Sequence, residues 1–383
     1  GYGVNLFNGQ EVGMSNEFAA RASFLLEAAP NTTIELALDY SELEEDMSVA
    51  RQIIEDAVGA GGVVRVGDWW DINSDAPITN QVSSFGGSLQ LTHDFNRVRF
   101  VSISAVRQFD WLYIADQDST PAFASTGSPD ATQIQASQEF QLQSDDSWPF
   151  EWIAGVFYFR NQTDQLLTFR GSSQAALGGF LDRYGEQDTT SYAAYAQATF
   201  NLTDRTHLTT GIRYTTDRRE ISAFDNTGIG VRNVVNRDEE WSEPTWRVAL
   251  DHQLTDDMLL FASYSRGFKS GVFNLNNQVV PPVNPEILDA YEVGFKSDWF
   301  DGRMRLNMAG FYYDYSDIQL VVRTAGASQI LNAAAAEMYG IDTEFLAMPT
   351  DDLTLRAGLN LLNAEYTSFP NAPGTFPSPA TCG

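Results

Sequence analysis

Hydrophobic and polar side chains alternate along most of the chain with a period of two. The alternation is regular over residues 34–40, 192–202, 291–299 and 353–361. In the third segment Tyr291, Val293, Phe295 and Trp299 alternate with Glu292, Gly294, Lys296 and Asp298. Because successive side chains of a β-strand point to opposite faces, this period predicts strands with one apolar and one polar face.

Short polar turns and longer loops separate the predicted strands in alternation. The short turns lie at 29–31, 95–97, 144–147, 203–205, 255–257, 301–303 and 350–352. The longer loops lie at about 45–80, 118–130, 172–187, 227–238, 277–285 and 324–329, and from 370 onward. Transmembrane barrels place their short turns on the periplasmic side and their long loops outside. The pattern therefore predicts about fourteen strands of an antiparallel up-and-down transmembrane β-barrel.

The apolar segments are too short for a transmembrane helix. The longest run, Trp152 to Phe159, has eight residues, whereas a spanning helix needs about 18. Residues 47–58 depart from the β pattern, because their apolar residues have helical spacing, and they predict a short helix in the first long loop. The fold class is all-β. A soluble β-sandwich is the alternative that alternation alone leaves open.

Charge and cysteine content narrow the classes of function. Acidic residues outnumber basic ones by 51 to 23, which gives a formal net charge of −28. Such a charge repels nucleic acid, so we expect no nucleic-acid partner. Cys382 is the single cysteine, which excludes a disulfide framework and a Cys-based zinc site. The chain begins with Gly1 and carries no secretory signal pattern, so we expect both ends to be cut.

Several segments resemble motifs of TonB-dependent outer-membrane receptors. Residues 260–274, LFASYSRGFKSGVFN, are similar to a recurrent strand-and-loop signature of that family. The segments that follow in the family's order are Asn284-Pro-Glu, 289–296 (DAYEVGFK), 308–319 (MAGFYYDYSDIQ), 332–337 (NAAAAE) and 339–345 (YGIDTEF). The resemblance is strongest over 258–369, and residues 1–257 share mainly the hairpin rhythm.

The resemblance implies a barrel of about 22 strands that encloses a separate plug domain. We expect residues 1–383 to be one partial barrel of about fourteen strands, without a plug domain and with its first long loop at about 45–80. The TonB box is then expected in the missing N-terminus. The resemblance also implies the outer membrane of a Gram-negative bacterium as location and outer-membrane lipid as a contact.

Residues typical of an active site are scarce. His93, His207 and His252 lie beside short turns, and none belongs to a zinc-binding pattern such as HExxH. The sequence contains no G-x-S-x-G nucleophile elbow and no phosphate-binding loop. We therefore expect no enzyme activity, no catalytic residue, no metal site and no cofactor.

Ligand capture is, by the resemblance, a property of the long loops. Trp69, Trp70 and Asp71 are candidate ligand-binding residues of the first long loop, because adjacent indoles stack on aromatic or sugar-like solutes. Anchoring of the loop on the barrel rim is the structural alternative. Arg266 and Lys269 are candidates for binding an anionic ferric chelate, and pairing with acidic residues is the alternative.

The favoured hypothesis is a receptor that imports a scarce solute, in the first place a ferric siderophore. The TonB–ExbB–ExbD complex is expected to supply the energy through the missing plug region. No residue selects iron, so cobalamin and carbohydrates stay open as ligands. A passive porin-like channel is the alternative from another class, and a plug domain with a TonB-contacting segment in the complete gene distinguishes the two.

Overall fold

The computed structural model describes residues 2–46, 67–68, 70–118, 120–275, 277–324 and 327–369. The helix predicted over 47–58, Trp69 and Cys382 therefore lie outside the described residues. Among the residues described, no helix is both long and apolar enough to cross a membrane.

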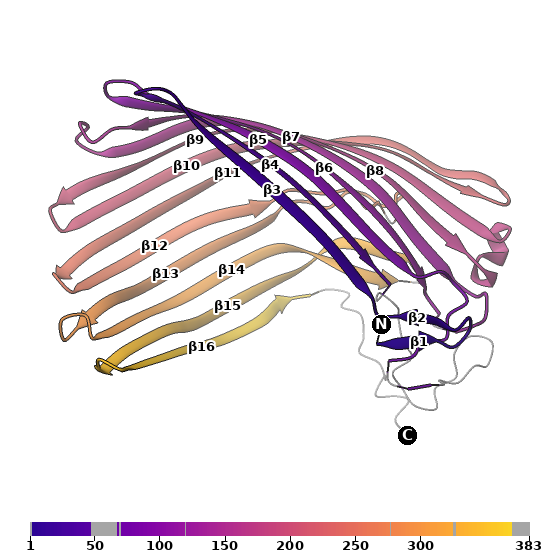
Figure 1. Ribbon diagram of the computed structural model, residues 1–383. Helices are drawn as coiled ribbons and strands as arrows, with labels where there is room; N and C mark the ends of the chain where they lie inside the picture. Colours follow the sequence, from indigo (N-terminus) through magenta and orange to yellow (C-terminus); the bar gives the residue numbers. More distant parts are fainter. Residues whose placement is uncertain are drawn as a thin grey trace.

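Fourteen consecutive strands form one antiparallel sheet, in the order of the sequence from β3 to β16 (Figure 1). Each strand is hydrogen-bonded to its neighbours in the chain, and β3 and β16 are the two edges. The strands are β3 (Ser15–Ala29), β4 (Thr32–Glu45), β5 (Thr79–Asp94), β6 (Val98–Asp116), β7 (Thr126–Ser144), β8 (Glu151–Arg170), β9 (Phe180–Thr203), β10 (Thr206–Thr227), β11 (Gly230–Thr255), β12 (Met258–Lys269), β13 (Glu286–Trp299), β14 (Met304–Thr324), β15 (Ala327–Thr350) and β16 (Leu353–Ser368). The predicted fold class and strand number are confirmed.

A small hairpin precedes the sheet, and one short helix interrupts it. The hairpin consists of β1 (Gly3–Asn5) and β2 (Gln10–Val12). A 3-10 helix, Ser172–Leu177, connects β8 to β9 and ends at Gly178, whose φ of 79° is left-handed. Sequence alternation did not reveal either element, because both are too short to show a period.

The two faces of the sheet differ in chemistry, as the alternation predicted. Leu36, Tyr192, Val293 and Leu359 lie on one face, which we call the apolar face, and their side chains are 37–63% exposed. The opposite, polar face carries Asp39, Arg107 and Glu292, among other charged residues. In a transmembrane barrel the apolar face meets lipid and the polar face lines the lumen.

The loop predicted at 227–238 is wrong. Strands β10 and β11 continue as a hairpin up to a turn at Gly228 and Ile229, and Thr227 pairs with Gly230. Charged residues at 217–220 and 237–240 interrupt the alternation in the upper parts of these strands, although Ile221, Ala223 and Val235 are buried there. Backbone pairing and a carboxylate hold the hairpin: Asp225 accepts hydrogen bonds from Arg183 and Asn233 at 2.8 and 2.7 Å.

Candidate functional site

The connection between β12 and β13, residues 270–285, folds back onto the polar face of the sheet, and we call it the strap. Phe273 of the strap is 3% exposed and packs in a cluster with Ile221, Ala223 and Val235. Those three residues belong to β10 and β11, which lie beyond β12 in the sheet. The strap therefore covers part of the polar face of the sheet instead of projecting into solvent.

Polar side chains attach the strap on both sides of β12. Gln278 donates a hydrogen bond to the carbonyl oxygen of Tyr184 in β9 at 2.9 Å. Arg237 of β11 donates to the carbonyls of Val279 and Val280. On the other side, Asn274 donates to the carbonyl of Ile330 at 3.1 Å and accepts from its amide. The strap is thus held from β9 to β15.

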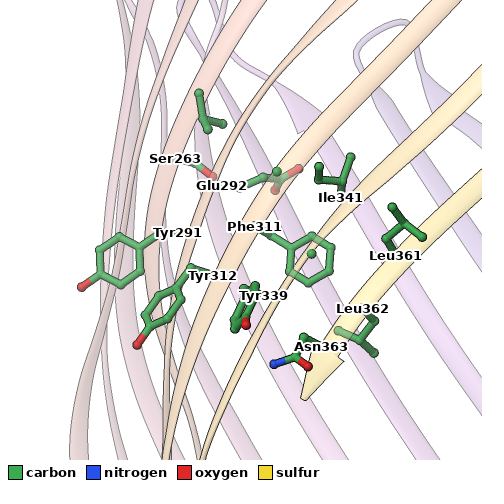
Figure 2. Close-up of a pocket in the computed structure, with 13 residues that line it drawn as sticks. Ser263, Tyr291, Glu292, Phe311, Tyr312, Tyr339, Ile341, Leu361, Leu362 and Asn363 are labelled. Carbon is green, nitrogen blue, oxygen red and sulfur yellow. The ribbon is translucent and has the colours of Figure 1, made fainter. Parts of the chain in front are cut away.

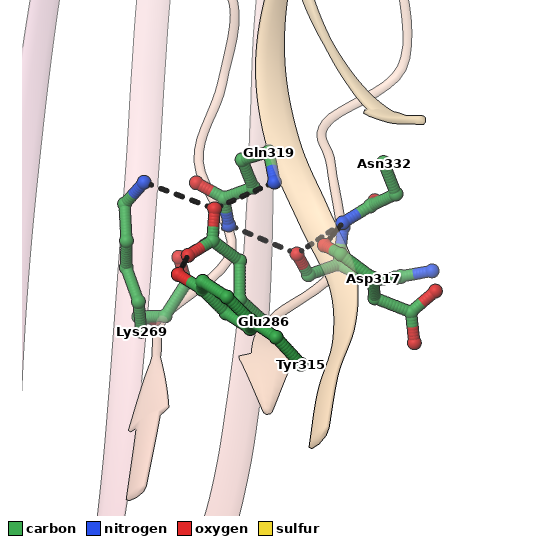
Figure 3. A network of polar contacts seen from close by, with 8 residues as sticks. Lys269, Glu286, Tyr315, Asp317, Gln319 and Asn332 are labelled. Carbon is green, nitrogen blue, oxygen red and sulfur yellow. Dashed lines mark hydrogen bonds and ion pairs between the residues drawn. The ribbon is translucent and has the colours of Figure 1, made fainter. Parts of the chain in front are cut away.

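Glu286 is the centre of a polar network where the strap enters β13 (Figure 3). Its side chain is 3% exposed and forms an ion pair with Lys269 at 3.2 Å. The carboxylate also accepts hydrogen bonds from the Tyr315 hydroxyl and, at 2.5 Å, from the Gln319 amide. The Gln319 side chain donates to the strap carbonyls of Ser270 and Asn284. A buried carboxylate is stable here because a cation and two donors surround it.

The structure places Arg266 and Lys269 on opposite faces of β12. Lys269 is opposite Glu286 on the polar face. Arg266 is opposite Asp289 on the apolar face, forms an ion pair with it at 2.5 Å, and lies 4.8 Å from the centre of the Trp246 ring. The two predicted cations are therefore not brought together, and each already has a carboxylate partner.

The first long loop contacts the β1–β2 hairpin. The centres of the Trp70 and Tyr2 rings lie 6.0 Å apart, and Trp70 is 62% exposed. The Asp71 carboxylate accepts hydrogen bonds from the amides of Val4 and Asp68, at 3.0 and 2.8 Å. Asp71 thus fixes the loop backbone, whereas the ring of Trp70 is exposed at the long-loop end of the sheet.

A half-buried carboxyl group, Asp75, lies further along the same loop. Burial raises the pKa of Asp75, and the neighbouring Asp118 carboxylate raises it further. Asp118 itself accepts hydrogen bonds from the Thr120 hydroxyl and the Ser125 amide. Asp75 of the β4–β5 loop thus lies near Asp118 of the β6–β7 loop, and the hydrogen bonds of Asp118 stay within its own loop.

A row of tyrosines marks the apolar face on the last strands. Tyr264, Tyr291, Tyr312 and Tyr339 are directly opposite one another on β12 to β15. Figure 2 shows three of them side by side at a hollow of about 810 Å3, which Val293 and Ile341 also line. Tyrosine rings at one depth are typical of the interfacial girdle of a barrel.

The histidines lie at the short-turn ends of their strands. His93 contacts Thr32, His252 contacts Thr206 and His207 contacts Asn201. In the part of the chain that the structure describes, no group of three or more His, Cys, Asp or Glu residues is arranged to hold a metal ion.

Sequence reasoning missed the strap. The sequence did carry a signal: residues 270–285 contain Phe273, several carboxamides and three prolines. Carboxamides bond to backbone at irregular positions, and prolines prevent strand pairing. Nothing local specifies that such a loop folds inward, because its partners lie on β9, β11 and β15.

Comparison with known proteins defines the class. The structure is an antiparallel sheet with one apolar face, one polar face and a strap folded onto the polar face. The sequence profile of the TonB dependent receptor-like β-barrel family matches residues 30–379. The chain belongs to this family, whose members are outer-membrane transport receptors and not enzymes.

Related sequences and solved structures agree with this assignment. The chain is 24% identical over 195 residues to the pesticin receptor of Yersinia enterocolitica, which covers 49% of this chain and 28% of that protein. It is 25% identical over 162 residues to the metal-pseudopaline receptor of Pseudomonas aeruginosa, covering 42% and 22%.

Two crystal structures share the fold at low sequence identity. The ferric yersiniabactin uptake receptor of Yersinia pestis superposes with a TM-score of 0.77 at 17% identity, over 96% of this chain and 55% of that one. The siderophore receptor PiuA of Acinetobacter baumannii gives 0.72 at 14%, over 94% and 59%. This chain thus spans little more than half the length of the solved receptors and about a quarter of the curated relatives.

Proposed function

We propose that the protein is an outer-membrane receptor of a Gram-negative bacterium that binds a scarce solute and imports it with energy delivered by TonB. Membership of the TonB-dependent receptor family over residues 30–379 carries this proposal. The lipid-compatible apolar face supports the location, and the polar face with its attached strap supports a solute path inside the barrel. The TonB–ExbB–ExbD complex is the proposed energy source.

A ferric siderophore is the proposed solute. Relatives and structural neighbours carry names such as ferric-pyoverdine receptor and ferric yersiniabactin uptake receptor. A metal-pseudopaline receptor and a copper transporter are also among them, so a metal chelate other than iron is the second candidate. Cobalamin, carbohydrates and passive porin-like diffusion stay as outcomes of the test.

Cells that carry the gene provide that test. Receptor abundance is compared between iron-limited and iron-replete cultures, and uptake of radioactive iron supplied as siderophore is measured in the wild type, a receptor deletion and a tonB deletion. We expect induction under iron limitation and loss of uptake in both deletions. Uptake that needs the receptor but persists without TonB identifies a passive channel. Unchanged abundance with unchanged iron uptake in the receptor deletion overturns the iron assignment.

A further inference from the structure

Two arginines stand side by side on the polar face of β10 and β11 without a carboxylate partner. Arg213 is opposite Thr245, and Arg247 is opposite Gly211, so the two are diagonal neighbours across one strand pair. Among the residues that the structure describes, neither guanidinium lies within 4.0 Å of a carboxylate. By contrast, Arg107, Arg183 and Arg266 each have one. Like charges at such neighbouring positions repel each other unless an anion lies between them.

Arg213 is held in a fixed position. Its guanidinium carbon lies 5.4 Å from the centre of the Phe157 ring and 5.7 Å from the centre of the Tyr195 ring. Its Nε donates to the Thr215 hydroxyl at 3.0 Å. Cation–π contacts and one hydrogen bond thus orient the group, and its two terminal nitrogens have no hydrogen-bond partner among the described residues.

A hollow lies between the two arginines. It has a volume of about 370 Å3, and its lining includes Arg213, Arg247, Gln197 and Ser265, together with Glu139, whose carboxylate accepts a hydrogen bond from the Tyr195 hydroxyl. Gly211 is part of the floor, and a Cβ atom at that position would approach the Gln197 side chain to 3.3 Å. The two guanidiniums outnumber the one carboxylate, and together with the carboxamide and the hydroxyl they are donors of the kind that bind an oxyanion.

The hollow lies within the membrane part of the wall. Gly211 follows the start of β10 at Thr206 by five residues. At about 3.3 Å per residue and a tilt of about 40°, this is roughly 13 Å above the short-turn end. A solute that reaches this depth has passed the strap and the mouth.

We propose that Arg213 and Arg247 form an inner-wall subsite for an oxyanion group, such as a carboxylate, of the imported solute. This inference rests on the proposed function, because it requires solute to move along the polar face. It narrows the substrate class to chelates that carry an anionic oxygen group. The alternative source of the oxyanion group is an acidic side chain from another part of the receptor.

Selenate, a small oxyanion that scatters anomalously, tests the subsite without knowledge of the natural ligand. Crystals of the receptor, produced as its gene encodes it, are soaked in selenate, and binding in detergent solution is measured by calorimetry. We expect an anomalous peak between the two guanidiniums in the wild type, and at least ten-fold weaker binding in Arg247→Gln and Arg213→Gln. Arg107→Gln is the matched control, since that polar-face arginine is paired with Asp39, and selenate binding should not change.

If a variant fails to fold, the crystal of the wild type still shows whether selenate binds between the two guanidiniums. A receptor carboxylate seated between Arg213 and Arg247 overturns the solute subsite and assigns the pair to an internal contact. Absence of a peak with an empty hollow also overturns it. Because selenate binding needs neither iron nor TonB, its failure is distinct from failure of the uptake experiment above.

Discussion

The ring of Phe261 lies directly over Gly294. The two residues are opposite each other on β12 and β13, on the polar face. A Cβ atom on Gly294 would lie 2.7 Å from the Phe261 ring and 2.3 Å from the carbonyl oxygen of Met308. Phe311 covers Gly340 in the same way, on β14 and β15. Each glycine admits a large neighbouring ring and allows the wall to curve tightly.

Replacement of Gly294 by alanine should therefore destabilise the sheet. The new methyl group overpacks the wall, and we expect the free energy of unfolding to fall by about 1–3 kcal/mol. Urea unfolding of the receptor in detergent, followed by tryptophan fluorescence, measures the change. Phe261→Ala in the same chain should recover only part of it, because the contact with the Met308 carbonyl remains.

Gly358 offers a matched control on β16. No atom lies within 4 Å of the position that its Cβ would occupy. Gly358→Ala should change the unfolding free energy by less than about 0.5 kcal/mol. Equal effects of alanine at positions 294 and 358 would show that strand propensity, and not the close approach of Phe261, determines the result.

The Glu286 network should be worth more than a surface ion pair. Glu286→Gln keeps the shape of the side chain but removes the charge that Lys269, Tyr315 and Gln319 contact. We expect a loss of about 1–3 kcal/mol, because charge-assisted hydrogen bonds to a buried group are lost. Asp256→Asn is the control: Asp256 is 87% exposed in its pair with Arg205, and the expected loss is below about 1 kcal/mol. A loss at Glu286 no larger than at Asp256 contradicts the network.

Phe273 should determine whether the strap stays on the wall. Phe273→Ala removes a side chain that is 3% exposed, and truncation of a buried Phe to Ala costs about 3–5 kcal/mol. The strap is a local element, so we expect faster proteolytic cleavage within 270–285 and little change in global unfolding. Val279→Ala, at a strap residue that is 49% exposed, should leave the cleavage rate unchanged. If both variants are cleaved like the wild type, the hydrogen bonds alone hold the strap.

The sheet and its faces were predictable because their signal is local. Leu36 and Leu38, or Tyr291 and Val293, reveal the apolar face by spacing alone, since lipid on one side and a polar lumen on the other impose the period of two. The upper hairpin of β10 and β11 escaped prediction because charged residues at 217–220 and 237–240 interrupt its alternation, and because Phe273, which covers its buried residues, lies far away in the sequence. There, pairing depends on register and on contacts such as that of Asp225 with Arg183.

The candidate site was less predictable, because residues far apart in the sequence build it. The charge of Arg266 or Lys269 is visible in the sequence, but the face that each occupies depends on its position in the register. A bulge between Tyr315 and Ile318 shifts the register of β14 against β15. The residues that contact Glu286 and Asn274 can be identified only when the position of this bulge is known. The unpaired state of Arg213 and Arg247 is likewise a property of three neighbouring strands, not of the local sequence.

A charge placed on either face should distinguish the two faces directly. Val156 on β8 lies on the apolar face and is 52% exposed, and Gln141 on β7 lies opposite Gly155 on the polar face. Val156→Arg exposes a cation to lipid, which costs about 2–4 kcal/mol near the middle of the bilayer. Gln141→Arg places the same cation in the polar lumen near Glu139, so little cost is expected.

The measurement is the fraction of receptor that folds into lipid vesicles. Folded receptor is recognised because it resists unfolding in detergent at room temperature. Val156→Arg should fold markedly less than the wild type and Gln141→Arg should match it, because only the first faces lipid. The reverse order would show that the apolar face is turned inward, and an equal loss in both variants would remove the basis for a membrane-spanning wall.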